Sequence, residues 1–172
     1  IQTLQVNIRF DHVGFRYKNS DEADAGSRVI HDMTLQIDKG RTVALVGPSG
    51  AGKTTLCHLI PRFYELNEGA ITIDGIDIRR MSRYDLRRNI GMVAQDVFLF
   101  NGTIRQNIAY GKLDATDEEI IEAAKKANIH EYIMTMEQGY DTQVGERGVK
   151  LSGGQKQRIS IARVFLKNPA IL

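Results

Sequence analysis

Apolar and polar residues alternate with a period of two at the start of the chain. Residues 4–10 follow this alternation, and residues 13–17 continue it after a polar break at Asp11 and His12. A period of two is typical of strands with one buried face, so we predict half-buried strands here. The same pattern returns at residues 33–37, after a polar segment from Lys18 to Arg28 that we predict to be an exposed loop.

Residues 42–46 are apolar on both faces, which predicts an interior strand of a parallel sheet. A glycine-rich turn follows, and we predict a helix from Lys53 to about Ile60, ended by Pro61. Residues 71–78 read as a strand, a turn and a second strand.

The pattern changes to helical spacing in the second half of the chain. Ser82 is predicted to cap a helix that runs toward Ile90, and residues 92–94 are a further strand candidate. Thr116 and Glu119 have the spacing of a capping box, and apolar residues recur from there to position 136. Ser152 is predicted to cap a last helix through position 166, and residues 170–172 open another apolar strand.

Composition narrows the possible classes only slightly. With 172 residues, 42% hydrophobic and 26% charged, the chain fits one soluble domain. A net charge of +2 gives no general attraction to nucleic acid or anionic lipid. No stretch approaches the ~20 apolar residues of a membrane span. The single cysteine, Cys57, has no disulfide partner within the chain, and we predict it to be buried on a helix.

One motif carries specific chemistry. Residues 47–54 match the pattern G-x-x-x-x-G-K-[ST], and they stand between a predicted buried strand and a predicted helix. Glycines let the backbone curl so that its N–H groups face a phosphate, and the helix start adds partial positive charge. Lys53 can reach the β- and γ-phosphates, and the Thr54 hydroxyl can ligate Mg²⁺. The alternative is a glycine-rich turn without a ligand. The predicted phosphate-binding residues are Gly47, Pro48, Ser49, Gly50, Ala51, Gly52, Lys53, Thr54 and Thr55.

A second glycine motif follows about 100 residues later. Residues 151–155, Leu-Ser-Gly-Gly-Gln, open the last predicted helix. By itself a Ser-Gly-Gly start is usually a helix cap. Combined with the phosphate loop, the motif closely resembles the signature of the ATP-binding cassette family, and the similarity extends over essentially the whole chain.

The resemblance implies a fold and a division of the chain. The implied class is α/β: a P-loop NTPase (RecA-like) core with a parallel sheet, an N-terminal antiparallel β-subdomain and an inserted α-helical subdomain. Residues 1–172 would form one cassette. Residues 1–95 would hold the antiparallel strands and the phosphate-loop core, residues 96–158 the helical subdomain, and residues 159–172 the return to the core.

The resemblance also assigns roles to individual residues. Tyr17, in a segment similar to the family's base-stacking segment, would stack on adenine, although core packing is the alternative for an aromatic residue at a strand end. Gln95 would contact Mg²⁺ and, with Lys53, serve hydrolysis. Two cassettes of the family close head to tail, so the signature would face the γ-phosphate held by the partner. The signature residues implied are Ser152, Gly153, Gly154 and Gln155.

Two segments are similar to exporter-type cassettes, namely residues 93–108 and residues 145–148. They indicate export. The family resemblance as a whole implies ATP and Mg²⁺ as ligands, a transmembrane domain and a second nucleotide-binding domain as partners, and no nucleic acid. The expected location is the cytoplasmic face of a membrane. Two alternatives stay open: a non-transport cassette ATPase of the DNA-repair or translation type, and a regulatory nucleotide-binding module.

Hydrolysis depends on acids that the family places after the signature helix. The sequence stops at Leu172, where the strand carrying them has only begun, so we expect these 172 residues to bind nucleotide weakly and to hydrolyse almost none. Asp74 and Asp77 flank a predicted turn and are expected to be solvated rather than catalytic. The four histidines show no metal-ligand spacing.

Overall fold

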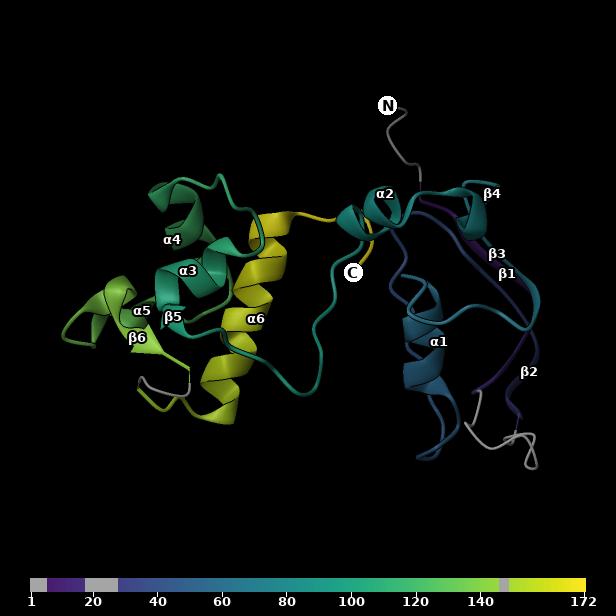
Figure 1. The fold of residues 1–172 in the computed structure, drawn as a ribbon, viewed down its shortest axis with the longest axis horizontal. Helices are drawn as coiled ribbons and strands as arrows, with labels where there is room; N and C mark the ends of the chain where they lie inside the picture. Colours follow the sequence, from purple (N-terminus) through teal and green to yellow (C-terminus); the bar gives the residue numbers. More distant parts are fainter. Residues whose placement is uncertain (1–5, 18–27, 146–148) are drawn as a thin grey trace. The chain divides into compact units, whose positions relative to one another are not determined.

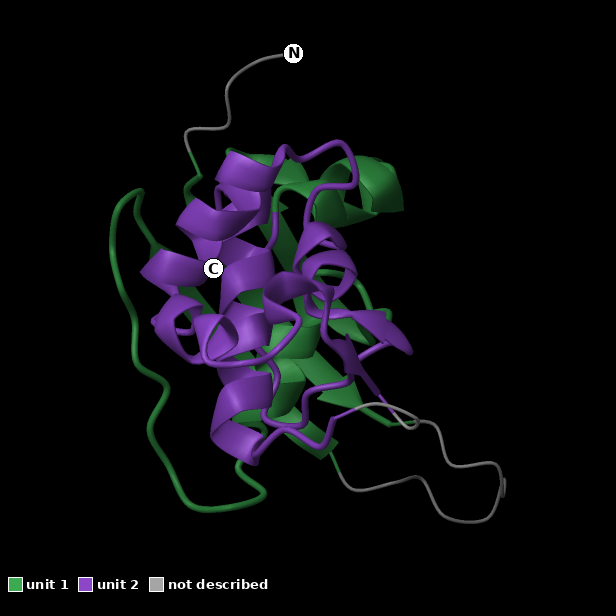
Figure 2. Ribbon diagram, turned by 90° about the vertical axis from the view of Figure 1, so that its left-hand side faces the viewer, with its two compact units in different colours: residues 1–89 green, residues 90–172 purple. Residues whose placement is uncertain are grey.

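The computed structural model describes residues 6–17, 28–145 and 149–172. They belong to two units, residues 1–89 and 90–172, which are green and purple in Figure 2. Figure 1 labels the helices and strands and colours the chain along its sequence. The predicted loop after Lys18, except Arg28, lies outside the described residues, as do Leu4 and residues 146–148. No helix among the described residues is long and apolar enough to cross a bilayer.

Unit 1 contains an antiparallel sheet with strand order β2-β1-β3-β4. The strands are β1 (Ile8–Arg16), β2 (Arg28–Ile37), β3 (Glu68–Ile73) and β4 (Ile76–Asp77). In β1 the buried side chains are Ile8, Phe10, Val13 and Phe15, as the alternation predicts. Phe10 and Val13 are an odd number of residues apart, and a register shift between them returns Val13 to the same face.

The turn and helices of unit 1 also follow the predictions. Asp74 and Gly75 have φ values of 52° and 79°, which is the backbone of a tight hairpin turn between β3 and β4. Helix α1 (Lys53–Leu59) ends one residue earlier than predicted, and η1 (Ile78–Arg80) follows β4. Helix α2 (Arg83–Arg88) begins after Ser82, whose side chain accepts a hydrogen bond from the Asp85 N–H, as expected.

The predicted strand at residues 42–46 is wrong in this structure. Residues 41–47 form no strand, and Val46 is 89% exposed. An interior strand of a parallel sheet needs a paired strand along each edge and helices over both faces of the sheet. The two other apolar strand candidates, residues 92–94 and 170–172, belong to unit 2. There the pairing is a single parallel bridge between Ile90 and Ile171, so those two strand predictions also fail.

Cys57 is a second correction. The thiol-bearing residue is on α1 as predicted, but it is exposed. The buried residues of α1 are Thr55, Leu56 and Leu59. Because successive residues of a helix are about 100° apart, Cys57 lies outside the face that those residues share.

Unit 2 is built around helices. Its elements are β5 (Gly102–Thr103), α3 (Ile104–Ala109), α4 (Asp117–Lys126), α5 (His130–Met134), η2 (Gly139–Asp141), β6 (Gln143–Val144) and α6 (Gly153–Lys167). One buried apolar cluster joins the helices and β6, with Ile108, Ile133 and Ile159 among its least exposed members. The helical spacing predicted beyond Gln95 is therefore confirmed. The single long periodic stretch is divided between α4 and α5, with Asn128 between them at φ 54°.

Candidate phosphate-binding and signature sites

The phosphate loop of unit 1 has a backbone that only glycine adopts easily. Gly50 and Gly52 both have φ of 83°. Gly52 is the N-cap residue of α1, and a Cβ added there would lie 3.1 Å from the Val29 carbonyl oxygen. Left-handed backbone and a close neighbour therefore both disfavour a larger residue at position 52. The loop thus curls directly into the first turn of α1.

Lys53 turns its side chain back into this loop. Its Nζ donates to the carbonyl oxygens of Gly47 at 2.8 Å and Pro48 at 2.7 Å. Thr54, the next residue, is exposed in the first turn of α1. The ammonium group and the Thr54 hydroxyl therefore belong to one curled segment, which suits a triphosphate and a hard cation held through oxygen.

Tyr17 follows β1 and contacts the same helix start. Its hydroxyl shares a hydrogen bond of 2.7 Å with Oγ1 of Thr55, which is 6% exposed. The Tyr17 ring meets Phe15 and Tyr64 edge-on, with centroids 4.9 Å and 5.1 Å apart. Sequence reasoning missed Tyr64 as a neighbour of Tyr17. Its signal was the pair of aromatic residues that follows Pro61.

The signature motif of unit 2 forms a capped helix start. Oγ of Ser152 accepts a hydrogen bond from the Gln155 N–H at 3.3 Å, and Oε1 of Gln155 accepts one from the Ser152 N–H at 2.7 Å. Gly153 and Gly154 are exposed, and a Cβ added to either would meet nothing within 4 Å. Internal packing therefore does not require glycine at these positions. Glycine there keeps the first N–H groups of a 15-residue helix accessible to an approaching group.

Gln95 is exposed and lies in unit 2, in the same unit as the signature. The carbonyl oxygen of Ala94, immediately before it, accepts a hydrogen bond from Nε2 of Gln157 at 3.3 Å. Gln157 is on α6, just past the signature. The residue before Gln95, Ala94, is therefore hydrogen-bonded to the signature helix. The phosphate loop and Tyr17 belong to unit 1.

Asp74 and Asp77 correct the expectation that they are solvated, because both are half-buried and accept hydrogen bonds within the protein. Oδ1 of Asp74 accepts a hydrogen bond from the Asn7 N–H at 2.8 Å. Asp77 accepts one from the Arg79 N–H at 2.8 Å and one from its guanidinium at 2.6 Å. The Arg79 side chain is the main reason that the pKa of Asp77 lies below its ordinary value. Both carboxylates therefore hold the turn around β4.

The described residues contain no group of three or more His, Cys, Asp or Glu side chains that could hold a metal ion. This is compatible with Mg²⁺ bound beside a nucleotide. That ion usually keeps several waters and takes one or two protein ligands together with phosphate oxygens. The Thr54 hydroxyl and the Gln95 amide oxygen are ligands of the type that such an ion accepts.

Comparison with known proteins agrees with this geometry. Residues 30–172 match the family model described as "ABC transporter". The chain is 58% identical, over its whole length, to an uncharacterized ABC transporter ATP-binding protein of Bacillus subtilis, YwjA, and covers 29% of that relative. It is 60% identical over 98% of its length to a putative multidrug export ATP-binding/permease protein, YgaD, of the same organism, and covers 28% of it.

A solved structure is similar as well. The structure of a bacterial Atm1-family ABC exporter with ATP bound superposes with a TM-score of 0.88 at 47% identity. The match covers 96% of this chain and 28% of the exporter chain. The predicted fold class, an α/β P-loop NTPase fold with an N-terminal antiparallel sheet, is thereby confirmed. The chain spans less than a third of the length of these relatives.

Proposed function

Because this chain belongs to the ABC transporter family, we propose that it binds ATP with Mg²⁺ and uses ATP to drive export across a membrane. The observation that carries the proposal is the loop of residues 47–55. Its glycines curl the backbone into the start of α1, and the Lys53 ammonium lies within the curl. A loop of this kind, with inward amides and a lysine, binds a phosphate chain by charge and hydrogen bonds.

The roles within this site follow from chemistry. Residues Gly47 to Thr55 surround the phosphates, with Lys53 neutralising charge on the β- and γ-phosphoryl groups. Thr54 and Gln95 supply oxygen ligands to Mg²⁺. The Tyr17 ring forms the surface on which adenine stacks, supported by its edge contacts with Phe15 and Tyr64.

The signature acts on the nucleotide of a second cassette. Gly153 and Gly154 leave open space at the start of α6, and the Ser152 and Gln155 side chains are already arranged around its first N–H groups. A head-to-tail pair of cassettes would bring this start to the γ-phosphate bound by the partner's loop. ATP then joins the two cassettes, and loss of the γ-phosphate releases them.

The further partner is a transmembrane domain, in the same chain or in another. Its support is the name of a relative, a multidrug export ATP-binding/permease protein. The cassette would then work at the cytoplasmic face of the membrane. We assign residues 1–95 to the β-subdomain and phosphate-loop core, residues 96–158 to the helical subdomain, and residues 159–172 to the core.

Hydrolysis needs an oriented water as well as neutralised charge. Lys53 and the Mg²⁺ that Thr54 and Gln95 would hold serve the second need, whereas Asp74 and Asp77 are engaged in the turn around β4. We therefore expect residues 1–172 by themselves to show little multi-turnover ATP hydrolysis. A phosphate-release assay on the purified chain tests this, and sustained turnover would contradict it.

Binding is tested by calorimetric titration with ATP and Mg²⁺. We expect measurable heat for the unsubstituted chain and a loss of at least about tenfold in affinity for Lys53→Met, because charge on the phosphates loses its partner. Lys39→Met is the matched control, since Lys39 is an exposed lysine of the same unit outside the loop. Equal affinities in the two variants would contradict the assignment of Lys53.

A further inference from the structure

Residues 96–101, between Gln95 and β5, have no regular secondary structure, yet side chains hold their backbone in place. The Phe100 N–H donates to Oδ1 of Asn107 at 2.9 Å, and Nδ2 of Asn107 donates to the Phe100 carbonyl oxygen at 3.0 Å. Nη1 of Arg163 donates to the Phe98 carbonyl oxygen at 2.9 Å. Two side chains, one from α3 and one from α6, therefore make the hydrogen bonds to this backbone that a neighbouring strand would make in a sheet.

These two side chains are also bonded to each other. Nη2 of Arg163 donates to Oδ1 of Asn107 at 2.7 Å, and Nε of Arg163 donates to the Asn107 carbonyl oxygen at 2.6 Å. Asn107 is 1% exposed. Burial lowers the pKa of Arg163, and the acceptors that the structure gives its guanidinium are three oxygens of neutral groups. Burying a charge in this way is unfavourable unless each donor is satisfied, so the geometry of the network is narrowly defined.

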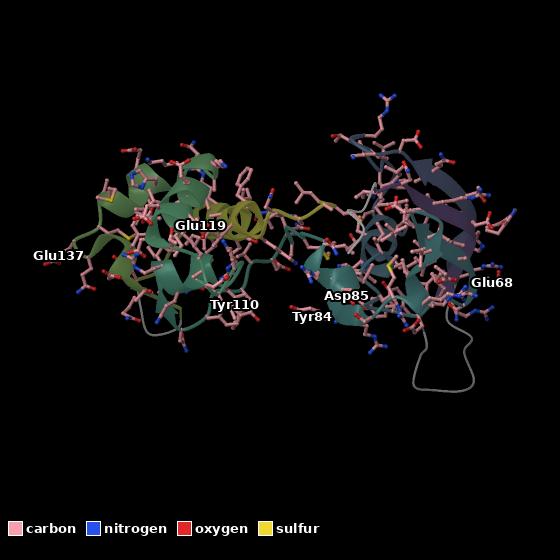
Figure 3. The ribbon with its side chains drawn as sticks, turned by 90° about the horizontal axis from the view of Figure 1, so that it is seen from above. Glu68, Tyr84, Asp85, Tyr110, Glu119 and Glu137 are labelled. Atoms are coloured by element: carbon pink, nitrogen blue, oxygen red, sulfur yellow. The ribbon has the colours of Figure 1, made fainter. Side chains whose placement is uncertain are left out.

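The backbone held by this network carries aromatic side chains on the surface. Phe98 is 70% exposed, and its ring meets that of Phe100 edge-on at 5.3 Å. Phe100 in turn lies 4.5 Å from the ring of Tyr110, which is labelled in Figure 3. The Arg163 guanidinium lies over the Phe100 ring at 5.4 Å. The direction in which these rings point therefore depends on Arg163 and Asn107.

Helix α6 connects this network to the signature. It begins after Ser152, and Arg163 lies about three turns further along the same helix. Gly111 has no Cβ, which allows its backbone to pack directly against the Arg163 carbonyl group, so α6 has little freedom at this point. The start of the helix and Arg163 belong to one continuous helix, so a shift of α6 as a whole would move both.

We propose that Arg163 is a positioning residue that, together with Asn107, makes the exposed Phe98–Phe100 aromatic segment follow the movement of the signature helix. The inference rests on the proposed function, because ATP is the ligand that would move α6. The partners of Arg163 are the Phe98 carbonyl oxygen, the Phe100 ring and both oxygens of Asn107, so its proposed role is to position this segment. The position of the Phe98 and Phe100 rings would therefore change when the signature helix moves.

The first test needs no nucleotide. Amide hydrogen exchange is measured for the peptide containing Phe100 in the unsubstituted chain, in Arg163→Lys and in Arg158→Lys. A lysine keeps the charge but cannot reach three acceptors from a planar fork, so we expect Phe100 to exchange about tenfold faster in Arg163→Lys. Arg158 is a matched control on the same helix, and it donates to the Asn128 carbonyl oxygen instead. Equal exchange in the two variants would overturn the proposal.

The second test follows the movement itself. The chain contains no tryptophan, so Phe98→Trp introduces a single indole on the exposed segment. We expect saturating ATP and Mg²⁺ to shift its emission, and we expect Arg163→Lys to remove most of that shift while Arg158→Lys retains it. Circular dichroism confirms that the variants fold. An unchanged shift in Arg163→Lys, or no shift despite binding, overturns the proposal.

Calorimetry on the same samples separates the two proposals. Absence of ATP binding by the unsubstituted chain contradicts the proposed function, and the exchange experiment then decides the role of Arg163 alone. Binding with normal affinity in Arg163→Lys, combined with a lost emission shift, supports a positioning role. That combination would not arise from general destabilisation, which lowers the affinity and the signal together.

Discussion

Both units expose a glycine-rich start of a helix, and they hold it by different means. In unit 1 the phosphate loop depends on left-handed glycines, and the segment before it, with Val46 89% exposed, has no strand pairing. In unit 2 the signature precedes a long helix that packs into a buried core and has a reciprocal side-chain cap. One site is thus determined by backbone conformation and the other by packing and capping. Substitutions in the two units should therefore change the free energy of unfolding by different amounts and, for the glycines, in opposite directions.

The largest contrast is expected between buried and exposed apolar residues. Ile159 on α6 is 1% exposed, and Ile159→Ala should lower the free energy of unfolding by about 2–5 kcal/mol through lost burial and a cavity. Val46→Ala in unit 1 should change it by less than about 0.5 kcal/mol. Urea unfolding followed by circular dichroism measures both. If both variants lost a similar amount of stability, residues 42–46 would be packed in solution. The two helix starts would then not differ in the packing around them.

The two glycine-rich starts should respond to alanine with opposite signs. Gly52→Ala places a Cβ on left-handed backbone beside the Val29 carbonyl oxygen, so it should cost about 1–3 kcal/mol of stability. Gly154→Ala meets open space in the first turn of a helix and should be neutral or stabilising by up to about 1 kcal/mol. Thermal or urea unfolding of the two variants decides the sign. A destabilised Gly154→Ala would mean that packing, rather than accessibility, requires that glycine.

The third contrast concerns capping. Ser152→Ala removes a hydroxyl that caps α6 and should cost about 1 kcal/mol. Ser49→Ala is the matched control, because Ser49 lies exposed in the phosphate loop and α1 has no side-chain cap. Its effect on stability should be close to zero. Equal losses in the two variants would show that Ser49 caps a helix start in solution.

The same contrast explains what the sequence could predict. The capped starts after Thr116 and Ser152 depend on bonds between residues three apart, so local spacing is sufficient to identify them. The curl of the phosphate loop is likewise encoded by its own glycines. The strand predicted at residues 42–46 depends on partners from distant segments, which an apolar run does not specify. Arg163 reaches Phe98 across 65 positions of the sequence, and no local pattern indicates that pairing.

The smallest expected effect is a pH dependence confined to unit 1. Nδ1 of His12 lies 2.6 Å from Oδ1 of Asp32, and this hydrogen bond is the main cause that raises the pKa of His12. Because the folded pKa is the higher one, the pair stabilises the unit fully below the ordinary histidine pKa of about 6.5, and the contribution is lost as pH rises through the folded value. Both side chains are exposed, so the effect is small and screened by salt.

NMR titration of the His12 imidazole should give a lower midpoint in Asp32→Asn than in the unsubstituted chain. Asp38→Asn, which changes an exposed carboxylate after β2, should leave the midpoint unchanged. Identical midpoints in all three proteins would show that the His12–Asp32 pair does not persist in water. The pair would then add no pH dependence to the stability of unit 1.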